Sequence, residues 1–307
     1  MMLSRKSKLL WIKIFSFFSI VRGYNIFVIA LAQYLAAIFI LSPEIRALDV
    51  ILDYQLFILV LASSLTIASG YIINNFYDAK KDLINRPRKV MIDRLVSQQT
   101  KLKVYFTINF IVALISFIVS WRAMLFFSVY IFLIWFYSHK LKKYPIVGNI
   151  TASVLAVLPF FGILLYYKNF YQVIFAHAVF LYLLILIREI IKDLENIEGD
   201  LSSNYRTIPV MFGEKIAKNL ILVLTISTVI PVYYLVDVFN VGYMDIYFYT
   251  SLLILVFFLI LLKKAKTKPQ YLKLHFLLKF IIVAGVFSIV LIEPSVLLHG
   301  KKLISAY

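Results

Sequence analysis

The stretch IINNFYDAKKDLINRP, residues 72–87, ends a long apolar run with a regular set of polar side chains. Asn74, Asp78 and Asp82 recur there every four residues, among lysines and arginines. On a helix, where each residue turns by about 100°, these three side chains lie within an arc of about 80°. The stretch therefore predicts an oxygen-rich face at the end of a strongly apolar helix.

The composition around this stretch indicates an integral membrane protein. Of the 307 residues, 63% are apolar and only 15% are charged, which is too little polar material to cover a water-soluble protein of this size. Long continuous apolar runs favour helices over the alternating strands of a membrane barrel. We predict an all-α polytopic membrane protein with nine transmembrane helices in one bundle, over residues 24–42, 55–76, 104–121, 123–138, 146–167, 170–187, 219–236, 243–262 and 276–298, with a tight hairpin at Trp121 and Arg122.

The positive charge is distributed unevenly between the two sides of this predicted bundle. The net charge is +17, and 27 of the 32 lysines and arginines fall on the side that holds the N-terminus and residues 80–103. This bias predicts a multi-pass protein of the cell (plasma) membrane, with a cytoplasmic N-terminus and a C-terminus outside. Residues 1–22 are expected to form a basic tail or an interfacial helix. The charge is attributed to topology and anionic membrane lipids, and no nucleic acid is expected as a partner.

A second acidic cluster lies in REIIKDLENIEGD, residues 188–200. Glu189, Asp193, Asn196 and Asp200 follow one another at steps of four, three and four, so they would share a narrow face if the helix continued through them. Glu195 lies off that face, and the role of Glu189 stays open. Both acidic clusters fall on the same predicted side of the membrane. The remaining acids of that side, Asp93, Glu198 and Glu214, are expected to be solvated charges.

The chemistry of these side chains favours a hard cation. Two carboxylates about 4 Å apart repel by roughly 4 kcal/mol at an effective dielectric constant of 20, so converging carboxylates need positive charge between them. The donors are oxygens, cysteine is absent and no histidines cluster, which suits Mg²⁺ better than zinc. Basic side chains that could hold phosphate are Arg22, Arg86, Lys140, Lys142, Lys143, Arg188 and Lys192. The alternative is that the acids only balance lysines or cap helix ends.

Five stretches together resemble one known family. They are NxxxDxxxD at 74–82, NRP at 85–87, YSHKLKKYPIVGN at 137–149, KDxxNxEGD at 192–200 and RTIPVMFG at 206–213. This combination is similar to the UbiA superfamily of membrane prenyltransferases, and the similarity covers about the whole chain. It implies one domain, residues 1–307, whose nine helices surround a central cavity. Two differences from the family pattern are Asn196, where many relatives have Asp, and RKVMIDR at 88–94.

The resemblance also implies a substrate and a set of site residues. An isoprenyl diphosphate would be held through Mg²⁺ by Asn74, Asp78, Asp82, Asp193, Asn196 and Asp200. The carboxylates of Asp78, Asp82, Asp193 and Asp200 would act in catalysis. The diphosphate-binding residues would be Arg22, Asn74, Arg86, Lys142, Lys143, Arg188 and Lys192. The allylic carbon–oxygen bond would ionise, and a lipophilic acceptor would capture the cation.

The acceptor is the least determined part of this prediction. The stretch at 188–200 is most similar to the branch that transfers a geranylgeranyl group to geranylgeranylglyceryl phosphate. One alternative is prenylation of an aromatic ring for a quinone or tocopherol-like product. Another is a non-enzymatic transporter or lipid-binding protein, although the middles of the predicted helices are almost free of the charges that transporters use. The sequence indicates no general base and no oligomeric state.

Overall fold

The chain is described here by a computed structural model covering residues 5–296, with side chains from Ile12 onward. Within this range nine helices are long and apolar enough to cross a membrane, at Gly23–Leu41, Tyr54–Asn85, Gln98–Val119, Trp121–Lys143, Val147–Tyr167, Gln172–Glu195, Ile208–Val238, Gly242–Lys264 and Lys268–Ile292. The prediction of an all-α, nine-helix membrane protein is confirmed. The predicted end of the last helix at residue 298 and the position of the C-terminus lie outside the described residues.

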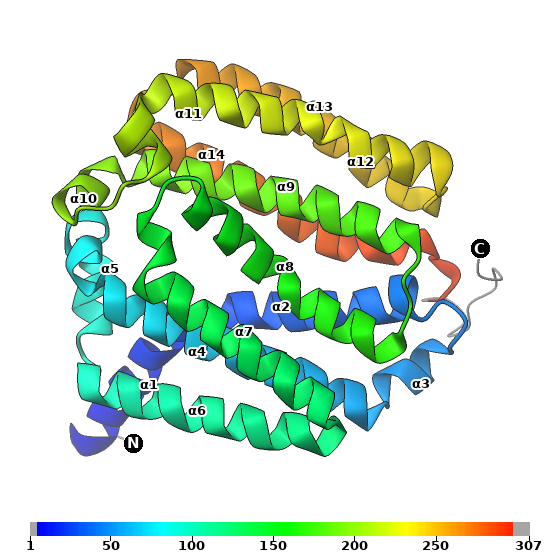
Figure 1. Cartoon of the computed structure of the whole chain (residues 1–307), viewed down its shortest axis with the longest axis horizontal. Coiled ribbons are helices and arrows are strands. Elements are labelled where there is room, and N and C mark those ends of the chain that lie inside the picture. The colour runs from blue at the N-terminus through cyan, green and yellow to red at the C-terminus, as the bar shows by residue number, and fades with distance from the viewer. Residues whose placement is uncertain (1–4, 297–307) are drawn as a thin grey trace.

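The long helices run side by side through the bundle (Figure 1). They are α2 (Gly23–Ala36), α4 (Tyr54–Asn85), α6 (Gln98–Val119), α7 (Trp121–His139), α8 (Val147–Tyr167), α9 (Gln172–Glu195), α11 (Ile208–Ser227), α13 (Asp245–Lys264) and α14 (Lys268–Ser288). The short elements are α3 (Ala47–Ile51), α5 (Pro87–Asp93), α10 (Ile197–Ser202), α12 (Val229–Tyr233), the π-helical turns η1 (Ala37–Leu41) and η3 (Tyr234–Val238), and the 3₁₀ turns η2 (Leu141–Lys143), η4 (Gly242–Met244) and η5 (Ile289–Ile292). We call the end that carries α5, η2 and α10, at the left of Figure 1, the motif end.

Local capping explains where several of these helices begin. Ser120 is extended, with φ −172°, and its Oγ accepts a hydrogen bond from the Ala123 N–H at the start of α7. The predicted tight hairpin is therefore present, and it turns on this single residue between α6 and α7. At the opposite end of the bundle the Asp53 carboxylate accepts from the Gln55 and Leu56 N–H groups at the start of α4. Such caps satisfy backbone donors that the helix itself leaves without partners.

The helix α4 is longer than the sequence analysis predicted. Its expected end was residue 76, but it continues to Asn85, so the first acidic motif lies inside the helix. It stops at Arg86, whose φ of −143° is not helical, because Pro87 disfavours a helical conformation in the residue before it. Pro87 then occupies the first turn of α5, where its missing N–H costs nothing.

The helix α9, by contrast, breaks within the second acidic motif. The condition under which Glu189, Asp193, Asn196 and Asp200 would share one helix face is not met, because α9 ends at Glu195 and Asn196 has φ −115° and ψ 18°. The Asn196 side chain donates through Nδ2 to the Lys192 carbonyl at 2.6 Å. This local bond competes with the backbone ladder and helps to end the helix. Asp200 is therefore placed by the separate helix α10.

A buried polar network joins α4, α5 and α6 at the motif end. Asp93, which we expected to be solvated, is only 3% exposed. It accepts a hydrogen bond from Asn75 Nδ2 at 2.7 Å and pairs with Lys89 at 3.4 Å. Asn75 in turn accepts from Nζ of the buried Lys101 at 2.8 Å. The expectation for Asp93 was wrong because tertiary packing supplies the Asn75 amide and the nearby Lys101, which together with Lys89 of the same helix compensate its burial. Of the other two acids, Glu198 is exposed and Glu214 pairs with Lys218.

The largest apolar core surrounds α9 and contains an open space. Ile187, Ile190 and Ile191 of α9 are fully buried and belong to one cluster with Phe258 of α13 and Leu278 of α14. Toward the opposite end of the bundle, a cavity of about 120 Å³ lies between α2, α8, α9, α13 and α14. The lining is almost entirely apolar, and it includes Leu184, Phe248 and Gly285.

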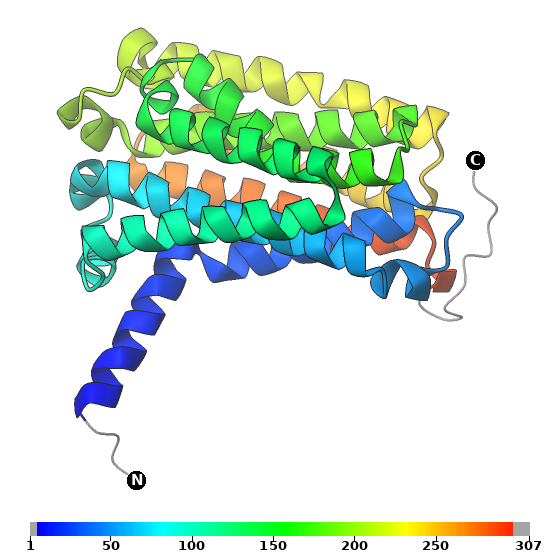
Figure 2. The same cartoon turned by 60° about the horizontal axis from the view of Figure 1, so that its bottom comes forward.

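The first helix, α1 (Arg5–Val21), leaves the bundle at the motif end (Figure 2). Residues 1–22 were expected to form either a basic tail or an interfacial helix, and the backbone of α1 is helical. Phe15 and Phe18 are 65% and 56% exposed, which is the kind of surface that an interfacial helix buries among lipid headgroups. The location of α1 at the membrane interface stays a prediction.

Candidate active site

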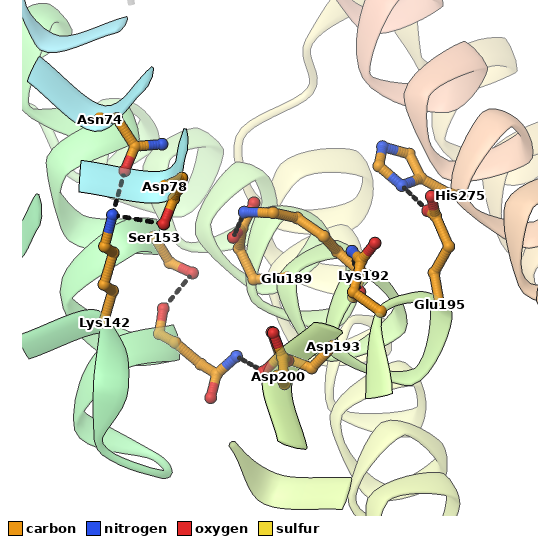
Figure 3. Close-up of polar contacts among 12 residues, drawn as sticks. Asn74, Asp78, Lys142, Ser153, Glu189, Lys192, Asp193, Glu195, Asp200 and His275 are labelled. Atoms are coloured by element: carbon orange, nitrogen blue, oxygen red, sulfur yellow. Dashed lines mark hydrogen bonds and ion pairs between the residues drawn. The ribbon is translucent and has the colours of Figure 1, made fainter. Parts of the chain in front are cut away.

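The two acidic motifs approach each other from different elements at the motif end. Figure 3 shows Asn74, Asp78 and Lys142 on one side and Asp193 and Asp200 on the other. A direct contact joins the two sides, because the Gly199 N–H of α10 donates to Asn85 Oδ1 of α4 at 3.2 Å. A Cβ at Gly199 would lie only 2.2 Å from Asn85 Nδ2. Position 199 therefore needs glycine for this close approach of α10 to α4.

On the α4 side a buried lysine is placed between the motif side chains. Lys142, from η2, donates to Asp78 Oδ1 at 2.7 Å and to Asn74 Oδ1 at 2.9 Å. The Tyr205 hydroxyl also donates to Asp78 Oδ1, at 3.0 Å. Burial, with the negative charge of Asp78 beside the phenol, raises the pKa of Tyr205 far above its ordinary value, so this hydroxyl stays a donor. Asp78 is thus held by one cation and one neutral donor.

On the α10 side the carboxylate of Asp200 is fully buried. Its Oδ1 pairs with Lys81 Nζ at 2.5 Å, and its Oδ2 accepts from the Thr207 hydroxyl at 3.2 Å. Burial raises the pKa of Asp200, and the adjacent Lys81 opposes that rise. Lys81 belongs to α4 and lies between Asp78 and Asp82 in the sequence. A lysine of the first motif therefore compensates an aspartate of the second.

The acids of α9 have different partners. Asp193 Oδ2 accepts from Asn149 Nδ2 of α8 at 2.7 Å, and no lysine or arginine within the described residues lies within ion-pair distance of it. Glu189 pairs with Lys192 at 2.7 Å. The Asp193 carboxylate is thus oriented by a neutral amide, and the ammonium of Lys192 is engaged by its own helix.

A second polar chain runs beside the site from α4 to α14. Arg86 Nη2 lies 3.4 Å from Glu195 Oε1, and His275 Nδ1 lies 3.1 Å from Glu195 Oε2. Asn196 is buried, and its Oδ1 has no hydrogen-bond partner among the described residues. The predicted site residue Arg86 is therefore tied to Glu195, a residue that the sequence analysis left off the shared face.

The other predicted basic residues lie around this centre with aromatic neighbours. Lys143 Nζ is 5.8 Å from the ring centroid of Tyr205. The Arg22 guanidinium lies 5.0 Å from the ring centroid of Tyr71, one turn before Asn74 on α4. Arg188 is half-buried on α9, with its Nε unpartnered. These cations have aromatic contacts or unused donors, which leaves them available to an anionic ligand.

Comparison with known proteins identifies the family. The profile of the UbiA prenyltransferase family matches residues 27–283. This chain belongs to the UbiA prenyltransferase family. It is therefore a UbiA-type prenyltransferase, and the alternative of a non-enzymatic transporter or lipid-binding protein is not supported.

Curated relatives point to one branch of the UbiA family. The digeranylgeranylglyceryl phosphate synthase of Methanobrevibacter smithii is 27% identical over 296 residues, which cover 88% of this chain and 97% of the relative. The enzyme of the same name from Methanosphaera stadtmanae is 32% identical over 198 residues, covering 63% of this chain and 72% of the relative.

Solved structures show that the chain has the UbiA fold. A structure of a digeranylgeranylglyceryl phosphate synthase in membranes superposes with a TM-score of 0.69, at 20% identity, covering 91% of this chain and 98% of the other. A UbiA homologue from Archaeoglobus fulgidus bound to GPP and Mg²⁺ superposes with a TM-score of 0.65, at 15% identity, covering 90% and 99%.

The residues of this UbiA site fit a hard divalent cation that is shared with a substrate. The donors that converge are carboxylate and amide oxygens, and Asn196 Oδ1 is a buried oxygen without a partner. In the described part of the chain no three histidine or carboxylate side chains gather closely enough to hold a metal by themselves. Mg²⁺ suits such a site, because it keeps several waters and binds through few carboxylates together with substrate phosphates.

Sequence reasoning missed four residues of the candidate site: Lys81, Asn149, Tyr205 and Thr207. Lys81 had a signal, since it stands three residues after Asp78 and so lies next to it on the helix. Asn149 ends one of the stretches that carried the family resemblance, and Thr207 lies in another. Tyr205 had no signal in a chain with 21 tyrosines.

Proposed function

We propose that this protein transfers a geranylgeranyl group from its diphosphate to the hydroxyl of geranylgeranylglyceryl phosphate, with Mg²⁺ as cofactor. The curated relatives of that name support the branch, and the Methanobrevibacter relative is matched over nearly its whole length. The observation that carries the proposal is the facing pair Asp78 and Asp200, each of which is held by a lysine of another element. Such a cluster suits a polyanion that arrives with its own divalent cations.

The reaction that this site would support has balanced charges and atoms. The allylic carbon–oxygen bond of the donor breaks, and its electron pair stays with the diphosphate. The acceptor hydroxyl oxygen forms the new ether bond and gives up its proton to the departing diphosphate. Lys81, Lys142 and Lys143 supply positive charge where negative charge develops on the leaving group. When bound, Mg²⁺ would supply further positive charge through Asn74, Asp78, Asp82, Asp193, Asn196 and Asp200.

The apolar cavity gives the isoprenyl chain a place away from water. Leu184, which lines the cavity, lies nine residues before Asp193 on α9, or about 14 Å along the helix axis. A long apolar tail could extend from the motif end toward this cavity. Exclusion of water also protects a reactive allylic cation from hydrolysis.

The orientation of the protein is part of the proposal. Most lysines and arginines of the sequence fall in segments of the motif end, so we place this end in the cytoplasm, with the helices in the plasma membrane. Diphosphate donor and acceptor headgroup would then reach the site from the cytoplasmic leaflet. Labelling of single cysteines introduced at exposed Glu198 and exposed Asp49 in intact cells tests this orientation, with Glu198 expected to be protected from an impermeant reagent.

The test of the reaction offers competing acceptors. Purified protein in vesicles with Mg²⁺ and labelled geranylgeranyl diphosphate is given geranylgeranylglyceryl phosphate in one reaction and a hydroxylated aromatic acceptor in another. We expect an ether-linked product with the glyceryl phosphate acceptor and none with the aromatic one. Transfer to the aromatic acceptor alone would overturn the assignment of the acceptor and favour quinone or tocopherol-like biosynthesis.

A further inference from the structure

Three half-buried cations lie deeper in the bundle than the acidic motifs, where α2, α9 and α14 meet. They are Arg22, just before α2, Arg188 of α9 and Lys279 of α14. Arg188 precedes Asp193 by five residues, which is about 7.5 Å along the helix axis. Lys279 follows His275 by one turn of α14. These three cations therefore form a layer that lies further from the motif end than the carboxylates that would hold the predicted diphosphate.

Tyr24 is the common neighbour of the three cations. Lys279 Nζ donates to the Tyr24 hydroxyl at 2.8 Å and lies 4.1 Å from the centroid of its ring. Arg22 and Arg188 are close enough for their charges also to act on that hydroxyl. Tyr24 belongs to α2 and Lys279 to α14, so their contact spans the seam between these two helices. The side chains thus converge from three elements on one position.

This layer has an excess of positive charge. No carboxylate of the described residues lies within 4 Å of Arg22, Arg188 or Lys279. The acid beside Arg188 is Glu189, which already pairs with Lys192 at 2.7 Å. Arg22 also lies close enough to Lys89 for the two charges to repel. Cations that converge without counter-charges repel one another, so their convergence points to an anion that completes the site.

The geometry of the two arginines suits a phosphate group. Arg22 has a positive φ of 52°, which is uncommon for a residue with a Cβ, and this bend between α1 and α2 sets its guanidinium against Tyr71. Arg188 keeps a buried Nε–H without a partner. A guanidinium presents its donors in a fork that matches phosphate oxygens. A strained backbone that positions such a donor is typical of a functional site.

We propose that Arg22, Arg188 and Lys279, together with the Tyr24 hydroxyl, bind the phosphate monoester of the acceptor, separately from the donor diphosphate. This inference rests on the proposed function and names its second substrate subsite. A phosphate monoester carries nearly two negative charges at neutral pH, which would compensate the excess in this layer. In glycerol phosphate the reacting hydroxyl lies on the carbon chain close to the phosphate. If the acceptor phosphate is anchored in this layer, further from the motif end than the carboxylates, the reacting hydroxyl would lie beside the allylic carbon of the donor.

The subsite assigns Arg22 and Arg188 to a different phosphate from the one in the sequence-based prediction. The donor diphosphate would keep Lys81, Lys142 and Lys143, which surround Asp78, Asp200 and Tyr205. An aromatic acceptor without a phosphate would leave the three cations uncompensated. The layer would therefore select for phosphorylated acceptors.

The test compares geranylgeranylglyceryl phosphate with its dephosphorylated form, geranylgeranylglycerol, on three variants, Arg22→Gln, Arg188→Gln and Lys279→Gln. We expect each variant to raise the KM for the phosphorylated acceptor about tenfold or more, since a hydrogen bond to a charged group contributes roughly that factor. The KM for geranylgeranyl diphosphate and the slow reaction with the dephosphorylated acceptor should stay within about twofold of the wild type. Binding of labelled geranylgeranylglyceryl phosphate without donor and without Mg²⁺ should weaken by the same factor, which gives a readout independent of turnover.

The controls separate this inference from a folding defect and from the proposed function. Lys273→Gln, at an exposed position of the same helix, should leave all constants unchanged, and Lys279→Arg should restore most of the acceptor affinity. A higher KM for the donor, or equal losses with both acceptors, would overturn the second subsite while leaving the proposed reaction in place. Failure of the wild-type protein to use the glyceryl phosphate acceptor would instead overturn the proposed function itself.

Discussion

The two acidic motifs have similar side chains but different backbones. In α4 the helix runs without a break to Asn85, so Asn74, Asp78 and Asp82 share a face as their spacing predicts. In the second motif the backbone leaves the helix at Asn196, and a short helix carries Asp200. Periodicity therefore locates oxygen donors only as far as the helix continues. In the second motif the hydrogen bond from the Asn196 side chain to the Lys192 carbonyl helps to end the helix, so the acidic side chains no longer share one helix face.

The motifs also differ in how their charges are compensated. Asp78 is held by Lys142 and Tyr205, and Asp200 by Lys81 and Thr207. Among the residues that the structure describes, only the neutral amide of Asn149 lies within hydrogen-bond distance of the Asp193 carboxylate. The carboxylate of Asp193 therefore has a greater need of an added cation than those of Asp78 and Asp200.

Removal of one carboxylate from either motif should have the largest effect. We expect Asp78→Asn and Asp193→Asn each to reduce transfer by a factor of about a thousand or more, because the Mg²⁺ that these carboxylates would hold no longer stabilises the negative charge of the leaving group. Membrane insertion should stay intact. Product formation in vesicles measures the loss, and Asp49→Asn, an exposed change in α3, is the matched control. Full activity in either variant would remove that residue from the site.

Removal of either lysine should destabilise the two carboxylates to different extents. We expect Lys81→Met to lower the free energy of unfolding by about 3 kcal/mol, because it leaves the fully buried Asp200 without a cation. Lys142→Met should cost less, since Asp78 is 14% exposed and keeps the Tyr205 hydroxyl. Thermal unfolding in detergent measures both variants. Equal losses would show that the two carboxylates are compensated in the same way.

The contact between the motifs can be broken at Gly199. We expect Gly199→Ala to lower the free energy of unfolding by about 1–3 kcal/mol, because the added Cβ would overlap with the Asn85 amide. Transfer activity should fall as α10 moves away from α4. A second change, Asn85→Ala, removes the overlapping amide and should recover part of the loss. No recovery in the double variant would mean that another contact fixes α10.

The smallest expected effect concerns the residue that ends α9. Asn196→Asp adds a carboxylate to the site and removes the donor to the Lys192 carbonyl. We expect the concentration of Mg²⁺ needed for half-maximal activity to fall a few-fold, while stability without metal falls by about 1 kcal/mol. Activity titrated with Mg²⁺ and thermal unfolding in a chelator measure the two effects. An unchanged Mg²⁺ requirement would place Asn196 outside the metal site.

Much of the architecture could be predicted from the sequence, and particular residues show where prediction stopped. The nine apolar runs and the hairpin near Trp121 follow from the length that a membrane imposes. Asp93 was misjudged because its partner Asn75 lies 18 positions away on α4, and because Lys101, which donates to Asn75, lies 26 positions from Asn75. Lys81 was overlooked because its partner Asp200 is on another element. Such pairings depend on packing that no local pattern encodes.

The amino-acid sequence alone predicts a membrane protein, the helical class, the family resemblance and the two sets of oxygen donors, because hydrophobic length and helical spacing are local properties. Which lysine pairs with which carboxylate, where α9 breaks, and the gathering of Arg22, Arg188 and Lys279 around Tyr24 became known from the folded structure. These features depend on charges that compensate one another through space, between elements distant in the chain. They become visible only once the helices are packed.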